Sequence, residues 1–400
     1  MTRTLLAGGD LFDGTGASPA LADVVIEGDR IAAVGTGLDA DVAIDVAGRT
    51  LLPGLFDCHV HVVLSHVDLW RLAQQPFSYR FYEAAANLER TLRVGITTVR
   101  DAGGADLGVK QAVDDGLIPG PRLRISLGML SQTGGHGDDW LPSGARVPLL
   151  IEHPGIPRTI VDGPDEMRRA VRELIAMGAD VIKVATSGGV LSPRDDPRHA
   201  HFRPIELEVL VEEAGAAGRW VMAHAQAADG IKQAIRAGIR SIEHGIYLDD
   251  EAIELMLARG TWLVPTLVAP QGVIDAADAG VPLPPIIVDK ARMVVDVHRA
   301  GFRRAVEAGV RIAMGTDSGV TPHGRNLREL ELMADGGMAA EAVLEATTRS
   351  AARLMGLDAL LGTVEPGKLA DLVVIAGGIE PMATISDRIE QVWKAGVRVV

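Results

Sequence analysis

The sequence is poor in cysteine, in long apolar runs and in basic residues. Cys58 is the single cysteine among 400 residues, so no intrachain disulfide can form and a reducing compartment is permitted. No uncharged apolar run reaches the roughly 18 residues that a membrane span needs, and the apolar run near the N-terminus is too short for a signal peptide. These absences predict a cytoplasmic protein with no membrane partner.

Acidic residues outnumber basic ones. The chain has 53 Asp and Glu against 39 Lys and Arg, a formal net charge of −14, and no basic block stands out that could neutralise phosphates. A nucleic-acid partner is therefore not expected. Hydrophobic residues make up 47% and charged residues 23% of the chain, which is typical of a globular protein. We expect a folded protein that acts on a small-molecule substrate.

The two ends of the chain are patterned alike. Residues 1–53 and 362–400 carry short runs rich in β-branched residues, separated by turn sequences such as Gly-Asp, Asp-Gly and Gly-Arg. The middle is patterned differently. The sequence therefore predicts one small β-domain assembled from both termini, residues 1–53 plus 362–400, beside a larger domain formed by residues 54–361.

A weak repeat organises the middle of the chain. A helix-like stretch ends in glycine, which supplies the left-handed cap, and a short apolar strand follows that finishes on a polar residue. The strand-like segments are LLPGLFDCHVH, ITTVRD, PRLRISLG, VIKVAT, WVMAHA, IRSIEHG, TWLVPT and VRIAMGTD. Eight such strands, most of them separated by helical stretches, predict an α/β fold with a (β/α)8 TIM barrel. An open doubly wound sheet is the alternative, because strand count alone does not close a barrel.

The segments between these strands are of two kinds. Most are amphipathic and are expected to form helices, over residues 165–177, 204–217, 229–237, 249–259, 289–308 and 339–355. Two others, residues 131–164 and 187–204, are rich in glycine, proline and histidine or in turn residues. Long irregular segments inside a compact barrel are usually lids or binding loops.

Residue types that bind metals gather at the ends of the predicted strands. His59 and His61 flank Val60 on the first strand, so both imidazoles project to the same side. The other polar strand ends are Asp101, Lys183, His224, Glu243 with His244, and Asp317. Because the C-terminal strand ends of a barrel and their loops build its active site, these side chains are expected to meet on one rim.

Lys183 is the unusual member of this group, because it lies inside the apolar run VIKVAT. An ammonium group is costly to bury. Either the pKa of Lys183 falls, or the amine pairs with an acid, or it is chemically altered. The pattern of the sequence leaves these three possibilities open.

Taken in their order along the chain, PGLFDCHVH, VIKVATSGG, MAHA, IEHG and MGTDSG resemble the motifs of the amidohydrolase superfamily, metal-dependent hydrolases built on a TIM barrel. The match spans nearly the whole chain. TGGHGD (Thr133–Asp138) and SGGVLSPRDDPRH (Ser187–His199) are similar to the imidazolonepropionase-like branch that contains metal-dependent prolidases and other Xaa-amino-acid dipeptidases. The resemblance implies a β-sandwich at the joined ends and a homo-oligomer.

The resemblance also implies two divalent metal ions. His59 and His61, together with Asp317, would hold the first ion, and His224 and His244 would hold the second. Histidine and carboxylate ligands suit zinc, with manganese, cobalt or iron as alternatives.

Lys183 would be carboxylated to a carbamate that bridges both ions, which resolves the cost of burying it as a cation. Asp317 would act as the catalytic base: a metal-bridging hydroxide attacks the scissile carbonyl, and Asp317 accepts its proton and delivers it to the leaving amine. Asp101 is expected to hydrogen-bond a ligand histidine, and Asp101 and Glu243 are the next candidates for the base.

The favoured substrate is a dipeptide, Xaa-Pro or Xaa-basic, or an N-acyl amino acid with a free C-terminal carboxylate. The donors expected to recognise that carboxylate are His136, Tyr247 and Arg203. A second possibility is the hydrolysis of another small amide, a carbamate, a urea, a lactone or an aryl ester, because barrel loops vary freely. A non-catalytic barrel scaffold is a remote alternative, and the presence of all six metal-type residues argues against it.

Overall fold

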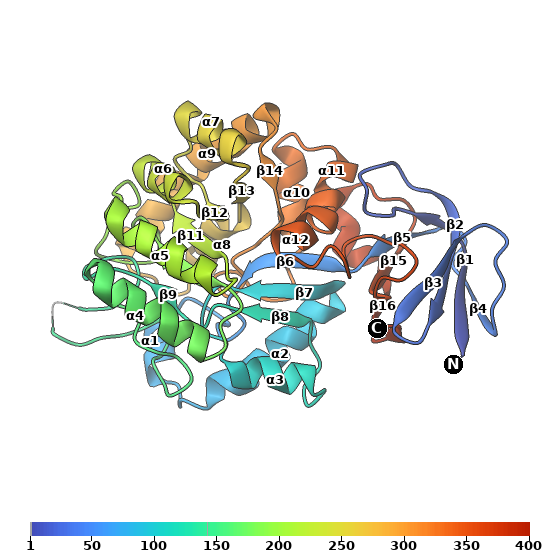
Figure 1. The fold of residues 1–400 in the computed structure, drawn as a ribbon, viewed down its shortest axis with the longest axis horizontal. Helices are drawn as coiled ribbons and strands as arrows, with labels where there is room; N and C mark the ends of the chain where they lie inside the picture. The colour runs from blue at the N-terminus through green and yellow to red at the C-terminus, as the bar shows by residue number, and fades with distance from the viewer. Residues whose placement is uncertain (1, 142) are drawn as a thin grey trace.

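Both ends of the chain enter one β-sheet at one end of the molecule (Figure 1). The computed structural model describes residues 2–141 and 143–400. The sheet has the order β17-β16-β15-β5-β1-β2-β3, with β4 beside β1. Its strands are β1 (Arg3–Leu11), β2 (Ala20–Glu27), β3 (Arg30–Gly35), β4 (Val42–Asp45), β5 (Arg49–Pro53), β15 (Leu372–Ala376), β16 (Ile389–Lys394) and β17 (Val397–Arg398).

The two ends are joined where β5 pairs antiparallel with β15, with Leu52 opposite Val373. Alternation along these strands buries one apolar face, on which Leu6, Val24 and Trp393 pack together. The strands of this sheet come from within residues 1–53 and 362–400, and the exact domain bounds remain a prediction.

The middle of the chain forms two parallel sheets. The first is β6 (Leu55–Val60), β7 (Ile96–Asp101) and β8 (Arg122–Ile125). The second has the order β14-β13-β12-β11-β10-β9, and its strands are β9 (Met129–Leu130), β10 (Ile182–Ala185), β11 (Val221–Ala225), β12 (Ser241–His244), β13 (Trp262–Val264) and β14 (Arg311–Ile312). All of these pairings are parallel.

The two parallel sheets are connected on one side by the chain itself and on the other by backbone hydrogen bonds. The predicted third strand is bent, so that β8 pairs with β7 and β9 with β10, and the bend contains Leu127 at a φ of 66°. On the other side, the N–H of Cys58 donates to Met314 O at 2.9 Å and the N–H of His61 donates to Ser318 O at 2.7 Å. The α/β fold with its barrel, predicted from the repeat, is confirmed.

Helices cover the outside of these strands (Figure 1). They are α1 (Leu69–Gln74), α2 (Tyr79–Arg93), α3 (Leu107–Asp114), α4 (Gly163–Ala176), α5 (Pro204–Ala216), α6 (Ala228–Ala237), α7 (Asp250–Arg259), α8 (Val268–Asp278), α9 (Pro285–Ala308), α10 (Arg328–Asp335), α11 (Ala340–Ala346), α12 (Arg349–Leu354) and the 3-10 helix η1 (Met382–Arg388). None of the helices that the structure describes is both long and apolar enough to cross a membrane.

Most of the predicted helices are present, and one prediction is wrong. Residues 339–355 form two helices, α11 and α12, instead of one. The break falls at Thr347, which pairs with the barrel: the N–H of Phe56 donates to Thr347 O at 2.8 Å, and Thr347 Oγ1 donates to Phe56 O at 2.9 Å. The Thr347 carbonyl thereby accepts from β6 in place of a bond along a continuous helix.

Candidate metal centre and active site

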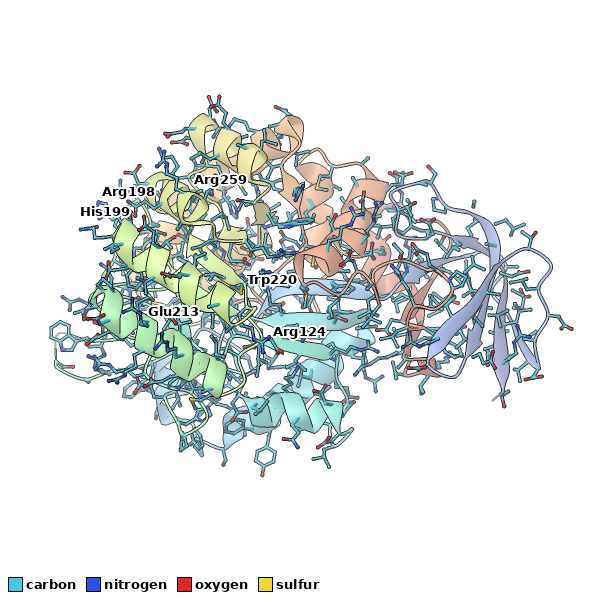
Figure 2. The ribbon with its side chains drawn as sticks, viewed as in Figure 1. Arg124, Arg198, His199, Glu213, Trp220 and Arg259 are labelled. Atoms are coloured by element: carbon cyan, nitrogen blue, oxygen red, sulfur yellow. The ribbon has the colours of Figure 1, made fainter. Side chains whose placement is uncertain are left out.

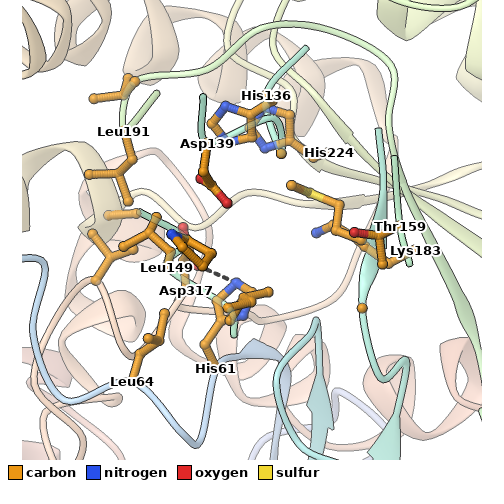
Figure 3. Close-up of a pocket in the computed structure, with 18 of the residues that line it drawn as sticks. His61, Leu64, His136, Asp139, Leu149, Thr159, Lys183, Leu191, His224 and Asp317 are labelled. Atoms are coloured by element: carbon orange, nitrogen blue, oxygen red, sulfur yellow. Dashed lines mark ion pairs between the residues drawn. The ribbon is translucent and has the colours of Figure 1, made fainter. Parts of the chain in front are cut away.

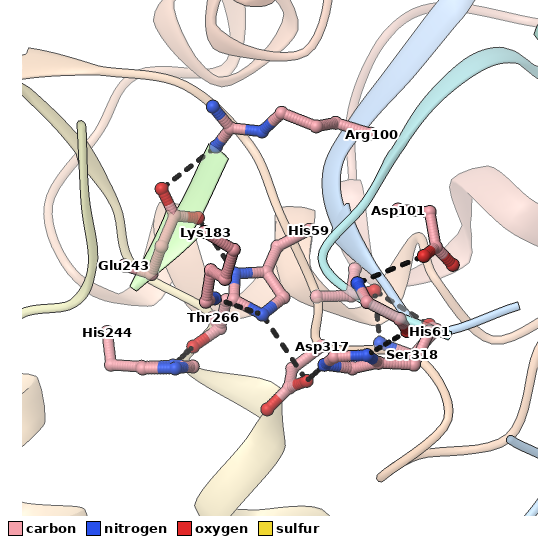
Figure 4. A network of polar contacts seen from close by, with 12 residues as sticks. His59, His61, Arg100, Asp101, Lys183, Glu243, His244, Thr266, Asp317 and Ser318 are labelled. Carbon is pink, nitrogen blue, oxygen red and sulfur yellow. Dashed lines mark hydrogen bonds and ion pairs between the residues drawn. The ribbon is translucent and has the colours of Figure 1, made fainter. Parts of the chain in front are cut away.

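The strand ends bring the predicted metal-type residues together at one mouth of the barrel (Figure 4). Oδ1 of Asp317, after β14, lies 3.5 Å from His59 Nε2 and 3.3 Å from His61 Nε2. Nζ of Lys183, on β10, lies 3.3 Å from the same His59 Nε2. Two residues from other parts of the barrel, Asp317 and Lys183, therefore lie against the histidine pair at the end of β6.

The remaining two histidines complete the group. The ring of His244, at the end of β12, lies 5.0 Å from that of His59 and 4.7 Å from that of His224 on β11, measured between centroids. One donor atom each from His59, His244 and Asp317 fall within 4.8 Å of one another. Such spacing allows several of these atoms to share one divalent ion, because metal–ligand bonds of about 2 Å place ligand atoms this close.

Each histidine of the group has one ring nitrogen engaged on the side away from the shared space. His59 Nδ1 lies 2.8 Å from Glu243 Oε2, and His61 Nδ1 lies 2.8 Å from Gly103 O. His224 Nε2 lies 3.2 Å from Gly188 O, and His244 Nδ1 lies 2.7 Å from Thr266 Oγ1. Bonds of this kind fix the ring and its tautomer. In His59, His61 and His244 these bonds leave Nε2 for a metal. In His224 they leave Nδ1.

Glu243 belongs to the support of this centre. Its side chain is fully buried. Besides His59, it accepts hydrogen bonds from Arg100 Nη2 at 2.9 Å and from Ser241 Oγ at 2.6 Å. Arg100 was missed at the sequence level, although a charged residue in the buried strand ITTVRD already required a partner.

Asp57 joins the two segments that carry the centre. Its carboxylate accepts from His59 N at 3.1 Å on β6, and from Thr316 Oγ1 at 2.6 Å and Asn326 Nδ2 at 2.9 Å beyond β14. The chain at Asp317 therefore has a fixed position relative to β6. Asp317 has a φ of 59°, an uncommon conformation for a non-glycine residue that occurs often at functional sites.

The predicted hydrogen bond from Asp101 to a ligand histidine is wrong. Its carboxylate accepts instead from the backbone N–H groups of Val62, Gly103 and Ala105, at 2.8 to 3.1 Å. These bonds hold the turn after β7. Asp101 thereby supports His61 indirectly, because the carbonyl of Gly103 contacts the His61 ring.

The electrostatics of the centre follow from burial. Desolvation lowers the pKa of Lys183 to about 8, against the attraction of Glu243 and Asp317. Desolvation, aided by neighbouring cations, holds the pKa of His224 and His244 well below the ordinary value. Burial acts to raise the pKa of Asp317, but His61, His59 and Lys183 outweigh it and hold that pKa below its usual range. Neutral histidines and an ionised carboxylate are the forms that bind metals.

A cavity of about 560 Å³ opens above these residues (Figure 3). One wall is apolar and is formed by Leu149, Leu150, Ile151, Ile156, Ile160, Val190 and Leu191. Polar side chains also line it, among them His136, Asp139, Arg146 and Arg158. Residues 131–162 and 186–203, which supply about half of this lining, contain no helix or strand among the residues described. Apart from His136, these residues were missed, because irregular segments carry no periodic signal that points a side chain inward.

His136 lies against the metal-type residues. Its ring stacks on that of His224 with centroids 4.1 Å apart and an angle of 17°. Its Nδ1 lies 2.7 Å from Ser192 Oγ and 3.3 Å from Asp195 Oδ2, which leaves Nε2 for a substrate. A Cβ on Gly189 would lie 2.2 Å from this ring, so glycine is needed where the second irregular segment passes His136.

Lys290 on α9 anchors that segment. Its buried ammonium donates to Gly189 O at 3.0 Å, to Ser192 O at 2.7 Å and to Asp195 Oδ1 at 3.1 Å. The same Asp195 carboxylate contacts His136. A buried salt bridge of this kind holds both the segment and the His136 ring in place.

The structure does not bring the other two predicted substrate contacts to the cavity. Arg203 is exposed at the N-terminus of α5, where its N–H donates to Glu206 Oε2 at 2.7 Å and caps the helix. Tyr247 is half-buried and packs with the apolar cluster of Val190, Ile246 and Val273. Neither is among the described residues that line the cavity.

Known proteins share this fold and sequence. A profile of the amidohydrolase family matches residues 50–399. The ochratoxinase of Aspergillus niger is 36% identical over 98% of this chain and 86% of its own length. A solved Xaa-Pro dipeptidase with bound methionine has a TM-score of 0.90 at 34% identity, over 99% of both chains. A prolidase complexed with N-methylphosphonate-L-proline has a TM-score of 0.89 at 36% identity, over 100% of this chain and 99% of the other. The chain therefore belongs to the amidohydrolase family and is a hydrolase of C–N bonds.

Proposed function

We propose that this protein is a binuclear metal-dependent hydrolase that cleaves the amide bond of a dipeptide, Xaa-Pro or Xaa-basic, or of an N-acyl amino acid with a free C-terminal carboxylate. One observation carries the proposal. Four of the histidines that line one cavity, His59, His61, His224 and His244, each have one ring nitrogen already engaged by a partner behind it. A set of imidazoles prepared in this way is typical of metal ligands.

The residues fit two divalent ions, of which zinc suits the donor set best. His59, His61 and Asp317 would hold one ion, and His224 and His244 the other. The ions would supply a deprotonated water at neutral pH and would polarise the scissile carbonyl.

Lys183 fits this arrangement only if it is modified. Its amine is buried and lies 3.3 Å from the Nε2 atom that His59 would offer to a metal, so as an ammonium it would repel a cation there. A lowered pKa of about 8 leaves part of the amine neutral. Attack of that amine on CO₂ forms an N–C bond and releases a proton, giving a carbamate whose oxygens can bridge two cations.

Asp317 is placed to move the proton. Its carboxylate is ionised, faces the cavity and lies within 3.5 Å of both His59 and His61. It would take a proton from the attacking water and pass it to the leaving nitrogen. Apolar side chains form one wall of the cavity, and less polar surroundings strengthen charge interactions.

Recognition of the C-terminal carboxylate is assigned to His136. Its Nε2 faces the cavity beside His224, and Asp195 and Ser192 fix the opposite nitrogen. The two solved relatives described above are named for dipeptides and for prolidase activity, which supports a dipeptide as substrate. We replace Arg203 in this role by Arg158, which lines the cavity.

The test compares kcat/KM for matched dipeptides with free and amidated C-termini. A charge-assisted contact contributes about 1.5–3 kcal/mol, so amidation should cost roughly ten- to a hundredfold per lost contact. His136→Ala should reduce the difference in kcat/KM between the free and the amidated substrate. Arg203→Ala, which removes an exposed guanidinium, should leave that difference unchanged. Equal cleavage of both substrates by the wild-type enzyme would contradict a dipeptidase.

Within the proposed substrate class, one observation favours an N-acyl amino acid with a bulky apolar acyl group. The observation that favours it is the apolar wall supplied by Leu149, Leu150, Ile151 and Ile156. Each buried apolar side chain can add about 1.5–3 kcal/mol when it leaves water. A series of N-acyl prolines of increasing chain length should show kcat/KM rising with length if this wall binds the acyl group.

A further inference from the structure

A second cavity, of about 150 Å³, lies at the opposite mouth of the barrel. It is lined by residues just before β10, β11 and β12, namely Asp180, Trp220 and Arg240, whereas the metal-type residues lie at the ends of these strands. Arg124 on β8 and Trp220 are both part of this lining, and both are labelled in Figure 2. The cavity is separate from the candidate active site.

Positive charge dominates this second cavity. Its described lining contains four arginines and one acid, and the arginines are Arg100, Arg124, Arg219 and Arg240. The Asp180 carboxylate already has three partners. It lies 3.2 Å from Arg124 Nη1 and 3.3 Å from Lys110 Nζ, and it accepts a hydrogen bond from Ile125 N at 3.0 Å. Such a cluster is unusual in a chain with a net charge of −14.

Two of the arginines have no carboxylate partner among residues 2–141 and 143–400. Arg219 Nε donates to Ala179 O at 3.0 Å. Arg240 donates through Nε to Leu354 O at 2.9 Å and through Nη2 to Arg353 O at 2.7 Å. Carbonyls satisfy part of their donors but do not neutralise their charge. Burial, with Arg100 nearby, lowers the pKa of Arg240, as expected where cations crowd together.

The walls of the cavity are well defined. The guanidinium carbon of Arg240 lies 3.9 Å from the centre of the Trp220 ring, and this stacking holds both side chains. Gly356 packs on the other edge of the ring, where a Cβ would lie 2.2 Å from Trp220 Cη2. The Arg240 guanidinium is therefore held in position before any ligand binds.

We propose that this cavity is a binding site for a small oxyanion of the phosphate or dicarboxylate type. Guanidinium groups present paired N–H donors that match two oxygens of such an anion. Both terminal nitrogens of Arg219 and one of Arg124 have no partner in the part of the chain that the structure describes. The volume equals that of about five water molecules, which fits a small anion and not a nucleotide.

The variants that test the site must spare the metal centre. Arg100 is unsuitable, because it also holds Glu243 and, through it, His59. Arg219→Gln and Arg124→Gln remove lining charges that are partly exposed. Arg259→Gln is the matched control, since Arg259 is exposed on α7 and is not among the described lining residues.

The experiment is calorimetric titration of the metal-loaded protein with inorganic phosphate and, separately, with malonate, at constant ionic strength. We expect one binding event that weakens about tenfold in Arg219→Gln and in Arg124→Gln and is unchanged in Arg259→Gln, with metal content and activity preserved in all three. Preferential binding of malonate or of phosphate identifies which oxyanion the site takes. The proposal is overturned if neither anion binds in a way that depends on Arg219 and Arg124, or if the control weakens binding equally.

Discussion

Nδ1 of His59 lies 2.8 Å from Oε2 of Glu243, inside the barrel and on the opposite side of the His59 ring from Asp317 (Figure 4). Arg100 Nη2 holds the other oxygen of the same carboxylate at 2.9 Å. Both side chains of the first pair are fully buried. Glu243 therefore lies on the side of His59 that faces away from the substrate cavity, which argues for a positioning role and against its being the catalytic base.

Glu243→Gln tests this role. A glutamine has one acceptor oxygen and cannot satisfy both His59 and Arg100. Loss of a partner behind a metal ligand typically costs ten- to a hundredfold in metal affinity, so the variant should lose metal on dialysis but regain nearly normal kcat in excess zinc. Elemental analysis of the wild-type protein should show up to about two ions per chain.

Glu254→Gln, a change of the same kind on the exposed face of α7, is the control and should bind metal as the wild type does. If Glu243→Gln kept its metal but lost turnover, Glu243 would have to be a base and not a support.

Lys183→Ala tests the carbamate. Removal of the bridging anion should release much of the metal and most of the activity. Short carboxylic acids such as acetate or propionate should restore part of both, because a carboxylate can occupy the space of the missing carbamate. Metal content and kcat measured with and without the added acid are the readouts. A fully metal-loaded wild-type crystal whose electron density ends at an unmodified amine would contradict this prediction.

Asp317→Asn separates ligation from proton transfer. Asparagine keeps the shape and an oxygen near His61 but cannot accept the proton of the attacking water. We expect metal to be retained and kcat to fall by about 10² or more, as is typical when general acid–base assistance is lost. The Glu243→Gln variant is the comparison, because it should lose metal affinity, whereas Asp317→Asn should lose kcat. Near-normal turnover of Asp317→Asn would require another base.

The strand-level features were the predictable part of this molecule. Period-two alternation fixes which side of β6 carries His59 and His61, and glycine at helix ends marks where each strand begins. The location of the candidate active site was predictable as well, because the strands of a barrel all end at one mouth, regardless of their loops. Position along a strand gave eight polar candidates, and the resemblance to the amidohydrolase superfamily selected from them the six residues that the structure brings together.

The loop-borne and long-range contacts were not predictable in the same way. Arg203 follows an irregular segment and was expected in the cavity, yet it caps α5 on the surface. Arg158 is 45 residues earlier and lines the cavity. The direction of a side chain on an irregular segment depends on its anchors, here Lys290 on a distant helix, and no local pattern encodes that.

The buried carboxyl group of Glu329 should make the stability of the protein depend on pH. Glu329 on α10 is buried, and its two carboxylate oxygens accept from the N–H groups of Leu267 at 2.7 Å and Val268 at 2.8 Å. Burial raises the pKa of Glu329 to about 8 from an ordinary value of 4.5, the two N–H groups lower it, and nearby Asp57 raises it. Desolvation therefore outweighs the hydrogen bonds.

Because the folded pKa is the higher one, the folded state keeps a proton that the unfolded state loses between pH 4.5 and about 8. The stability that Glu329 contributes is full below pH 4.5 and is lost as the pH rises through about 8, at up to about 1.4 kcal/mol per pH unit. Glu329→Gln removes this titration. Thermal unfolding of both proteins from pH 5 to pH 9 should show the wild-type Tm falling relative to that of the variant as the pH rises. Glu331→Gln, on the same helix, should follow the wild type, and a constant gap between wild type and Glu329→Gln would mean that Glu329 ionises in the folded protein as it does in water.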